Sequence, residues 1–87
     1  MIRIWAKVLK NDKIVKQFSF IKDGDIDYSE FFSYLKTICE TLDIPTPILI
    51  KSHLFYFAKY NGRRFKADDF VESINFDKLV LENMFDK

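Results

Sequence analysis

The segment 44–62 constrains the fold more than any other part of the chain, because it contains a helix start, a run rich in aromatic residues and a helix stop. Thr46 is a favourable N-cap residue, and Pro47 suits the first helical position, where a backbone N–H group would have no partner. Gly62, which follows Asn61, fits the left-handed C-cap position at the end of a helix. The sequence therefore predicts a helix over residues 48–60.

This predicted helix is unusually apolar. Its hydrophobic side chains cover an arc of about 200° when successive residues are placed about 100° apart. They are Leu49, Ile50, Leu54, Tyr56, Phe57, Ala58 and Tyr60. Lys51, Ser52 and Lys59 form a narrow polar ridge, and Phe55 on this ridge is a candidate exposed anchor for a partner. We expect the apolar part of the helix to be covered on more than one side.

A second helix is predicted upstream and ends near Leu42. Asp27 is its expected N-cap, and Glu30 stands in the position of a capping-box partner. Its apolar residues gather in one stripe, as in a helix that packs a single face on a core. The stripe consists of Tyr28, Phe31, Phe32, Leu35, Ile38, Cys39 and Leu42.

The beginning of the chain predicts a β-hairpin. Residues 2–10 and 14–21 alternate between apolar and polar side chains, and Asn11-Asp12 between them is typical of a turn. Because register follows the buried face, we expect even residues to pair with even ones through a three-residue loop, Asn11-Asp12-Lys13, with a bulge. One face then carries Ile4, Ala6, Val8, Ile14, Phe18 and Phe20.

The rest of the chain adds one more strand. Residues 63–77 have an irregular pattern with a short helical turn near Asp68–Val71, and Lys78–Met84 is the last predicted strand. The expected order is β-β-α-α-β. We therefore predict one small α+β domain over residues 1–87, with a three-stranded, mainly antiparallel sheet and two helices packed on one face.

Composition narrows the class of protein. The chain has 14 basic and 13 acidic residues, a net charge of +1, whereas a dedicated nucleic-acid binder usually has a larger basic excess. The single cysteine, Cys39, cannot form an internal disulfide, so the fold does not need an oxidising compartment. We see no signal-peptide or membrane-spanning pattern. A cytoplasmic protein that does not insert in a membrane is expected.

Several motifs resemble those of a known family. They are Ile2-Arg3-Ile4-Trp5-Ala6-Lys7, Leu42-Asp43-Ile44-Pro45-Thr46-Pro47-Ile48, Arg64-Phe65, Asp69-Phe70-Val71-Glu72 and Phe76-Asp77. In this order, and over nearly the whole chain, they are similar to a family of short uncharacterised bacterial proteins, mainly from anaerobic Gram-positive bacteria. In those relatives a Trp follows Pro-x-Pro-Ile, where this chain has Leu49. The resemblance implies a shared fold and a bacterial cytoplasmic setting, and it implies no activity or site.

Few side chains in the sequence are suited to chemistry. We expect His53, the only histidine, to be a partly buried residue with a hydrogen-bond partner, because no second histidine or clustered cysteine accompanies it as a metal ligand. Cys39 lies in a core stripe and is expected to be an inert thiol. Asp23, Asp25 and Asp27 lack the span and the closing glutamate of a calcium loop, so we interpret them as a helix cap and a solvated loop.

Catalysis is not indicated. The sequence has no phosphate-binding loop, dinucleotide-binding fingerprint, nucleophile elbow or zinc-protease motif. A chain of this length also rarely builds a pocket with convergent polar groups. We therefore expect a protein that is not an enzyme and has no catalytic, cofactor or metal site.

Two groups of residues are candidates for partner binding. Trp5, Lys7, Leu9, Val15 and Gln17 are expected on the sheet face that points away from the helices, unless residues 63–77 fold back over it. Arg63 and Arg64 form the densest positive run and can contact phosphate or an acidic partner. The alternative for this run is ion pairing with Asp68 and Asp69 that anchors the 63–72 loop against the helices.

The leading hypothesis is a protein-interaction module that binds another protein, or a second copy of itself, through the Trp5 face. The alternative is weak nucleic-acid binding through Trp5, Arg3, Lys7 and Arg63-Arg64, since bases stack on aromatic side chains and basic residues hold phosphates. The clustered aromatic residues and glycines of a common RNA-binding sheet are absent, which favours the protein partner.

Overall fold

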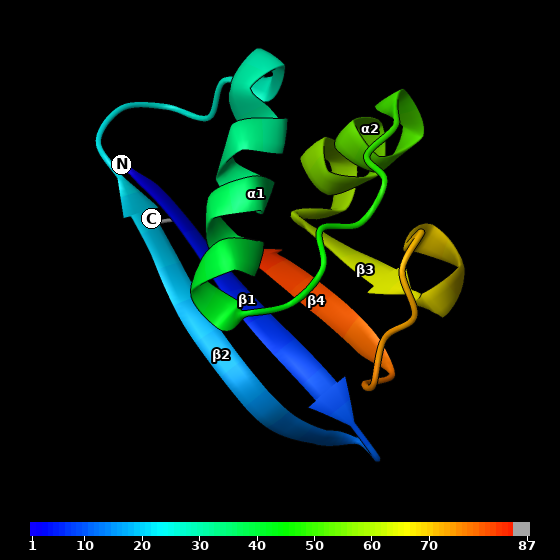
Figure 1. The fold of residues 1–87 in the computed structure, drawn as a ribbon. Coiled ribbons are helices and arrows are strands. Elements are labelled where there is room, and N and C mark those ends of the chain that lie inside the picture. Colours follow the sequence, from blue (N-terminus) through cyan, green and yellow to red (C-terminus); the bar gives the residue numbers. More distant parts are fainter. Residues whose placement is uncertain (85–87) are drawn as a thin grey trace.

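The structure is a computed structural model that describes residues 1–84. Two helices and an antiparallel four-stranded sheet of order β2-β1-β4-β3 form the domain (Figure 1). The strands are β1 (Ile2–Lys10), β2 (Lys13–Lys22), β3 (Gly62–Lys66) and β4 (Lys78–Asn83). The helices are α1 (Phe31–Leu42) and α2 (Lys51–Tyr60), with short 3-10 turns η1 (Tyr28–Glu30) and η2 (Ala67–Asp69).

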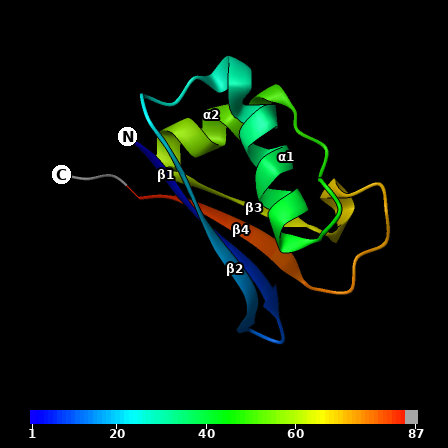
Figure 2. The same cartoon turned by 60° about the vertical axis from the view of Figure 1, so that its left-hand side comes forward.

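Both helices lie on one face of the sheet, as expected from the sequence (Figure 2). Helix α1 packs on β2 and α2 packs on β3, which leaves the core between the helices and the sheet. The core is strongly aromatic: the rings of Phe31 and Phe57 join the two helices edge to face, with centroids 4.9 Å apart. The α+β class and the single helical layer are thus confirmed.

The strand count predicted from the sequence was wrong. Residues 62–66 form an additional edge strand, β3, which pairs with β4 in the segment expected to be an irregular loop. This strand is short, and Phe65 is its only buried side chain. A five-residue strand with one buried side chain has too little alternation to be recognised from the sequence. The strand forms because the edge of β4 would otherwise be unpaired.

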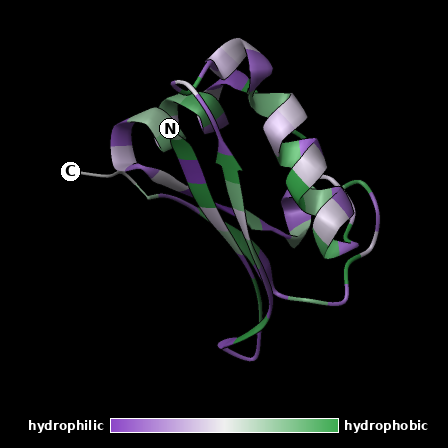
Figure 3. Ribbon diagram, turned by 90° about the vertical axis from the view of Figure 1, so that its left-hand side faces the viewer, coloured by the Kyte–Doolittle hydropathy of each residue, from purple (hydrophilic) through white to green (hydrophobic). Residues whose placement is uncertain are grey.

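The hairpin has the predicted pairing through a different turn. Ile4 pairs with Phe20 and Ala6 with Phe18, so even residues do face even ones. The turn contains only Asn11 and Asp12, both with positive φ, as in the tight turns that suit β-hairpins. Hydrophobic and hydrophilic residues alternate along β1 (Figure 3).

A bulge in β2 reconciles the two-residue turn with that register. Val8 pairs with Lys16 and Leu9 with Ile14, so Val15 is the extra residue. Ile14 is therefore on the outer face with Leu9, and not on the core face where the sequence placed it. Lys16 takes the inner position and donates from Nζ to the Leu42 carbonyl at the end of α1 (2.9 Å).

The start of the first helical segment follows the prediction in part. Asp27 is a cap, but its carboxylate accepts hydrogen bonds from the backbone N–H and the hydroxyl of Ser29, and Glu30 makes no capping bond. The first turn is the 3-10 turn η1, and the α-helix begins at Phe31. It ends after Leu42, as predicted, with Asp43 in the left-handed conformation.

Helix α2 begins later than the sequence predicted. Residues 44–50 are not helical: Ile48 donates its backbone N–H to the Asp69 carbonyl (2.8 Å), which draws this segment along η2. The helix begins once Ile50 donates its N–H to Nδ1 of His53 (3.3 Å). A tertiary hydrogen bond thus overrides the favourable Thr46-Pro47 start signal.

The surroundings of α2 also differ from the prediction. Only His53 and Phe57 are buried on this helix, whereas Tyr56 and Tyr60 are exposed. The expected cover on more than one side is therefore wrong, since α2 lies at the margin of the sheet, where it packs mainly on the edge strand β3. The helix ends at Asn61, which is the left-handed C-cap in place of Gly62.

Neither helix of residues 1–84 has the length and hydrophobicity required to cross a lipid bilayer.

Candidate partner-binding surfaces

The outer face of the sheet, which points away from the helices, carries most of the residues singled out in the sequence. Since side chains alternate between the two faces of a strand, the paired residues Trp5 and Glu82 share this face, as do Lys7 and Val80. Gln17 pairs with Lys7, and Arg64 pairs with Val80, so this row of outer-face residues crosses all four strands. The members of this outer face are Arg3, Trp5, Lys7, Leu9, Ile14, Gln17, Ser19, Ile21, Gly62, Arg64, Lys66, Lys78, Val80 and Glu82.

The indole of Trp5 is half-buried within this face by its neighbours. Its Nε1–H group donates to Oε1 of Gln17 (3.1 Å). The Lys7 ammonium lies 4.3 Å from the centre of the indole and also forms an ion pair with Glu82. Trp5 therefore has a fixed position, with an apolar ring surface at the centre of a polar and basic surround.

Nothing in residues 1–84 covers the outer face. The alternative that residues 63–77 fold back over it is wrong, because this segment buries Phe70 and Phe76 in the core with ring centroids 5.6 Å apart. Apolar residues on or beside the face are consequently open: Val15 is 52% exposed and Ile21 is 55% exposed.

The outer face is also more basic than the chain as a whole. Its basic residues outnumber its acidic ones within the part of the chain that the structure describes. They are Arg3, Lys7, Arg64, Lys66 and Lys78, against Glu82 alone. Although the chain as a whole is nearly neutral, its charge is unevenly distributed, and the positive charge of the outer face attracts acidic partner surfaces.

A separate apolar patch surrounds Phe55, which at 71% is the most exposed of the large hydrophobic side chains of α2. It contributes to an open depression of about 410 Å³ with Tyr28, Leu54 and Ala58. The sequence-based expectation that Phe55 is exposed is confirmed. This patch lies on the helical layer, apart from the outer face that holds Trp5.

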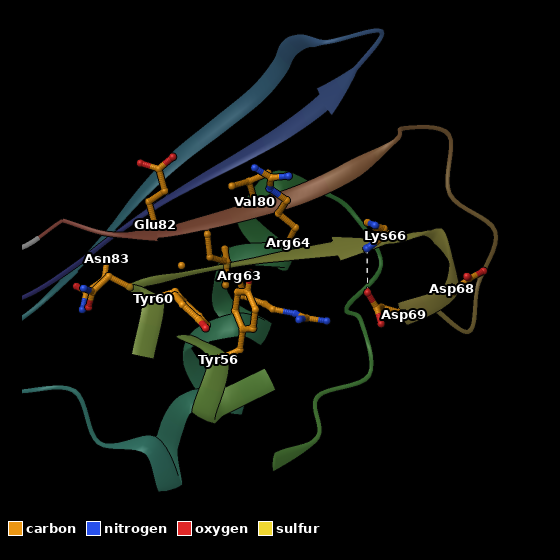
Figure 4. Close-up of a pocket in the computed structure, with 13 residues that line it drawn as sticks. Tyr56, Tyr60, Arg63, Arg64, Lys66, Asp68, Asp69, Val80, Glu82 and Asn83 are labelled. Carbon is orange, nitrogen blue, oxygen red and sulfur yellow. Dashed lines mark hydrogen bonds between the residues drawn. The ribbon is translucent and has the colours of Figure 1, made fainter. Parts of the chain in front are cut away.

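A larger groove of about 780 Å³ runs along β3, the edge strand (Figure 4). Tyr56 and Tyr60 form one wall from α2, with ring centroids 4.6 Å apart. Arg63 lies on the same side of β3 as these rings, whereas Arg64 points to the opposite side. We name this region the β3-edge groove; it is lined by Tyr56, Tyr60, Arg63, Arg64, Lys66 and Asp69, among others.

The structure separates the two arginines that are adjacent in sequence. The guanidinium of Arg63 lies 5.1 Å from the Tyr56 ring centre and 5.9 Å from that of Phe65. Among residues 1–84, neither Arg63 nor Arg64 pairs with a carboxylate, so the expected ion pairs with Asp68 and Asp69 are absent there. Arg63 holds β3 against α2 through the Tyr56 ring instead.

His53 has the structural role that the sequence favoured. It is buried, its Nδ1 accepts the Ile50 N–H group, and its Nε2 lies 3.8 Å from a carboxylate oxygen of Asp69. Burial and the positive charge of Arg63 lower the pKa of His53, and the Asp69 carboxylate opposes this shift only in part. His53 is therefore neutral at pH 7 and caps α2.

Cys39 is fully buried in α1, as its place in the core stripe predicted. Burial raises the pKa of its thiol to about 11, which a hydrogen bond with Thr46 offsets in part. At neutral pH the thiol is protonated and shielded from reagents.

The structure thus brings together six of the residues selected from the sequence and leaves two apart. The six on or beside the outer face are Trp5, Lys7, Leu9, Val15, Gln17 and Arg64, whereas Phe55 and Arg63 lie elsewhere.

Sequence reasoning missed the roles of Tyr56 and Tyr60, because their helical positions indicated burial. It also missed Val80 and Glu82, whose face depends on the pairing of β4 with β1. Alternation within residues 78–83 is the one signal that pointed to them.

Scans against protein-family models, curated proteins and solved structures each find no match to this chain.

Proposed function

We propose that this protein is a non-enzymatic interaction module of the bacterial cytoplasm that binds another protein through the outer face of its sheet. The observation that carries the proposal is the uncovered face around Trp5, in a domain whose helices occupy the opposite side (Figure 2). A fixed indole with exposed apolar residues beside it resembles the anchors that contribute most of the affinity at protein interfaces.

The charge of the outer face favours one kind of partner over another. Two copies packed face to face would bring the basic residues of one against those of the other, which is unfavourable. A protein with an acidic rim around an apolar patch complements both the charge and the Trp5 surface. We therefore favour a different protein over a second copy.

The test is affinity capture from the native host with matched variants. Trp5→Ala removes the anchor, and Ile21→Glu places a negative charge on the same face without touching the core. Phe55→Ala removes an exposed ring from a different surface and serves as the control. A specific partner retained by the wild type and by Phe55→Ala, and lost by both outer-face variants, supports the proposal. Equal capture by all four proteins would refute it.

Analytical sedimentation distinguishes binding of a different protein from self-association of this chain. We expect the wild type to sediment as a monomer at high micromolar concentration. A dimer that Trp5→Ala dissociates would replace the heterologous partner with a second copy of the chain.

Nucleic-acid binding is the second candidate, and the basic residues on the outer face favour it. Arg64 shares this face with Trp5, Arg3 and Lys7, although Arg63 does not. Only one aromatic ring lies on the face within residues 1–84, so stacking of successive bases has little support. Titration with single-stranded oligonucleotides at low and moderate salt tests it, because phosphate contacts weaken as salt rises. Binding that is insensitive to salt would exclude this candidate.

A further inference from the structure

We propose that the β3-edge groove is a second binding site, which takes an extended acidic peptide segment as an additional strand on β3. This site adjoins the outer face, with which it shares Arg64 and Lys66, but it rests on the backbone of an edge strand and on Arg63. Exposed strand edges are used in this way by several classes of peptide-binding domain.

The hydrogen-bond pattern of β3 shows which backbone groups are available. Asn83 donates its backbone N–H to the Asn61 carbonyl (2.8 Å). In an antiparallel ladder, residues that bond to the neighbouring strand alternate with residues whose N–H and C=O groups point the other way. Gly62, Arg64 and Lys66 therefore direct their backbone groups away from β4.

One end of this edge is already closed. The backbone N–H of Lys66 donates to the carboxylate of Asp69 (2.9 Å), shown by the dashed line in Figure 4. The free part of the edge thus belongs to Gly62 and Arg64, whose N–H and C=O groups can pair with a few residues of an added strand. The Asp69 carboxylate also makes this end of the groove unfavourable for acidic residues, so the acidic side chains of a ligand are expected nearer Gly62 and Arg64.

Arg63 supplies the strongest attraction for an acidic side chain. Its guanidinium lies over the Tyr56 and Phe65 rings, and no carboxylate in residues 1–84 forms an ion pair with it. Its Nε atom is buried without a hydrogen-bond partner. A cation that is partly withdrawn from water and lacks a counter-charge attracts a carboxylate more strongly than a fully solvated one.

The chemistry of the ligand follows from the two sides of β3. Side chains of an added strand alternate, so one set lies beside Arg63, Tyr56 and Tyr60, and the other beside Arg64. Each side offers positive charge, and the tyrosine wall adds apolar surface. An extended segment with both glutamates and aliphatic residues on each face complements this arrangement.

The test uses the whole protein and a labelled peptide of sequence Glu-Glu-Val-Val-Glu-Glu-Val-Val, in which both faces carry both residue types. Fluorescence anisotropy should show saturable binding. Arg63→Gln should weaken binding about tenfold through the loss of a charge-assisted hydrogen bond. Lys36→Gln, which removes an exposed charge from α1, should change the affinity less than about twofold.

A pair of variants at one position isolates the backbone contribution. Arg64→Gln removes the charge and keeps the outward N–H group, whereas Arg64→Pro removes both and leaves the bonds to β4 intact. Arg64→Pro should bind several-fold more weakly than Arg64→Gln. If Arg64→Pro does not fold, the same peptide methylated on alternate backbone nitrogens should bind the wild type more weakly than the unmodified peptide.

Three outcomes would overturn the proposal. The first is the absence of saturable binding at about 1 mM peptide, a concentration at which even weak complexes are detected. The second is an equal loss of peptide affinity in Arg63→Gln and Lys36→Gln. The third is equal affinity for the methylated and unmodified peptides. Trp5→Ala should leave peptide binding unchanged, which keeps this result separate from that of the outer face.

Discussion

The carbonyl oxygen of Leu81 lies 2.9 Å from the position that a β-carbon would occupy on Gly62. Gly62 is thus required for the close approach of β3 to β4. The charged residues of β3 begin with the next residue, Arg63. The left-handed conformation that the sequence assigned to Gly62 belongs to Asn61, with a φ of 56°. Two adjacent residues that read as one turn signal therefore have different functions.

We predict that Gly62→Ala destabilises the protein by about 1–3 kcal/mol, because a methyl group would force backbone atoms of two strands apart. Asn61→Gly is the matched control, since glycine accepts the left-handed conformation without strain, and it should change stability by less than about 1 kcal/mol. Urea unfolding followed by circular dichroism measures both. Similar losses for the two variants would contradict the assignment.

Phe57→Ala should reduce the free energy of unfolding by about 3–5 kcal/mol, as for other buried rings. The Phe57 side chain is fully buried and meets Phe31 at the contact between the helices. Phe55→Ala, two positions earlier on the exposed side of α2, should change stability by less than about 0.5 kcal/mol. Chemical denaturation of both variants compares the two faces of one helix, and comparable losses would mean that the faces are misassigned.

Stability should fall as the pH decreases below the ordinary His53 pKa of 6.5. Burial lowers the pKa of His53 in the folded protein, so the unfolded chain binds a proton first, and protonation then favours unfolding. The stabilising effect of the neutral imidazole is fully present above this value. In His53→Gln, the decrease in unfolding free energy between about pH 7 and pH 5 should be smaller. Equal slopes for the two proteins, measured by urea denaturation, would exclude this role.

The thiol of Cys39 should be inert to Ellman's reagent in the native protein at pH 8. Burial and a pKa of about 11 leave little thiolate and no access to it. Unfolding in guanidinium chloride should release one reactive thiol per chain, in proportion to the fraction unfolded. Rapid reaction of the native protein would show that α1 opens locally.

Local pattern was sufficient for the elements with strong periodicity. The alternation of β1 and the even pairing of the hairpin follow from side chains that had to share a buried face. The predicted stripe of α1 was correct in part: Phe32 is exposed, whereas Tyr34, which was outside the stripe, is buried. The Trp5 surface was predictable for the same reason, because odd residues of β1 must point away from the core once even residues point into it.

Other features depended on contacts distant in sequence. The start of α2 is set by the hydrogen bond between Ile48 and Asp69, and strand β3 exists because β4 lies beside it. Tyr56 and Tyr60 have the helical positions of core residues, yet they are exposed because α2 lies at the margin of the sheet.

The sequence alone determined the α+β class, the even pairing of the hairpin and the identity of the inner and outer faces of β1, since each follows from the spacing of apolar residues along one element. The tertiary structure decided that the sheet ends in β3, that Arg63 and Arg64 point to opposite sides of it, and that a groove forms between this edge and α2. Those features arise from pairing between segments whose own patterns are weak, and only the assembled sheet brings such segments together.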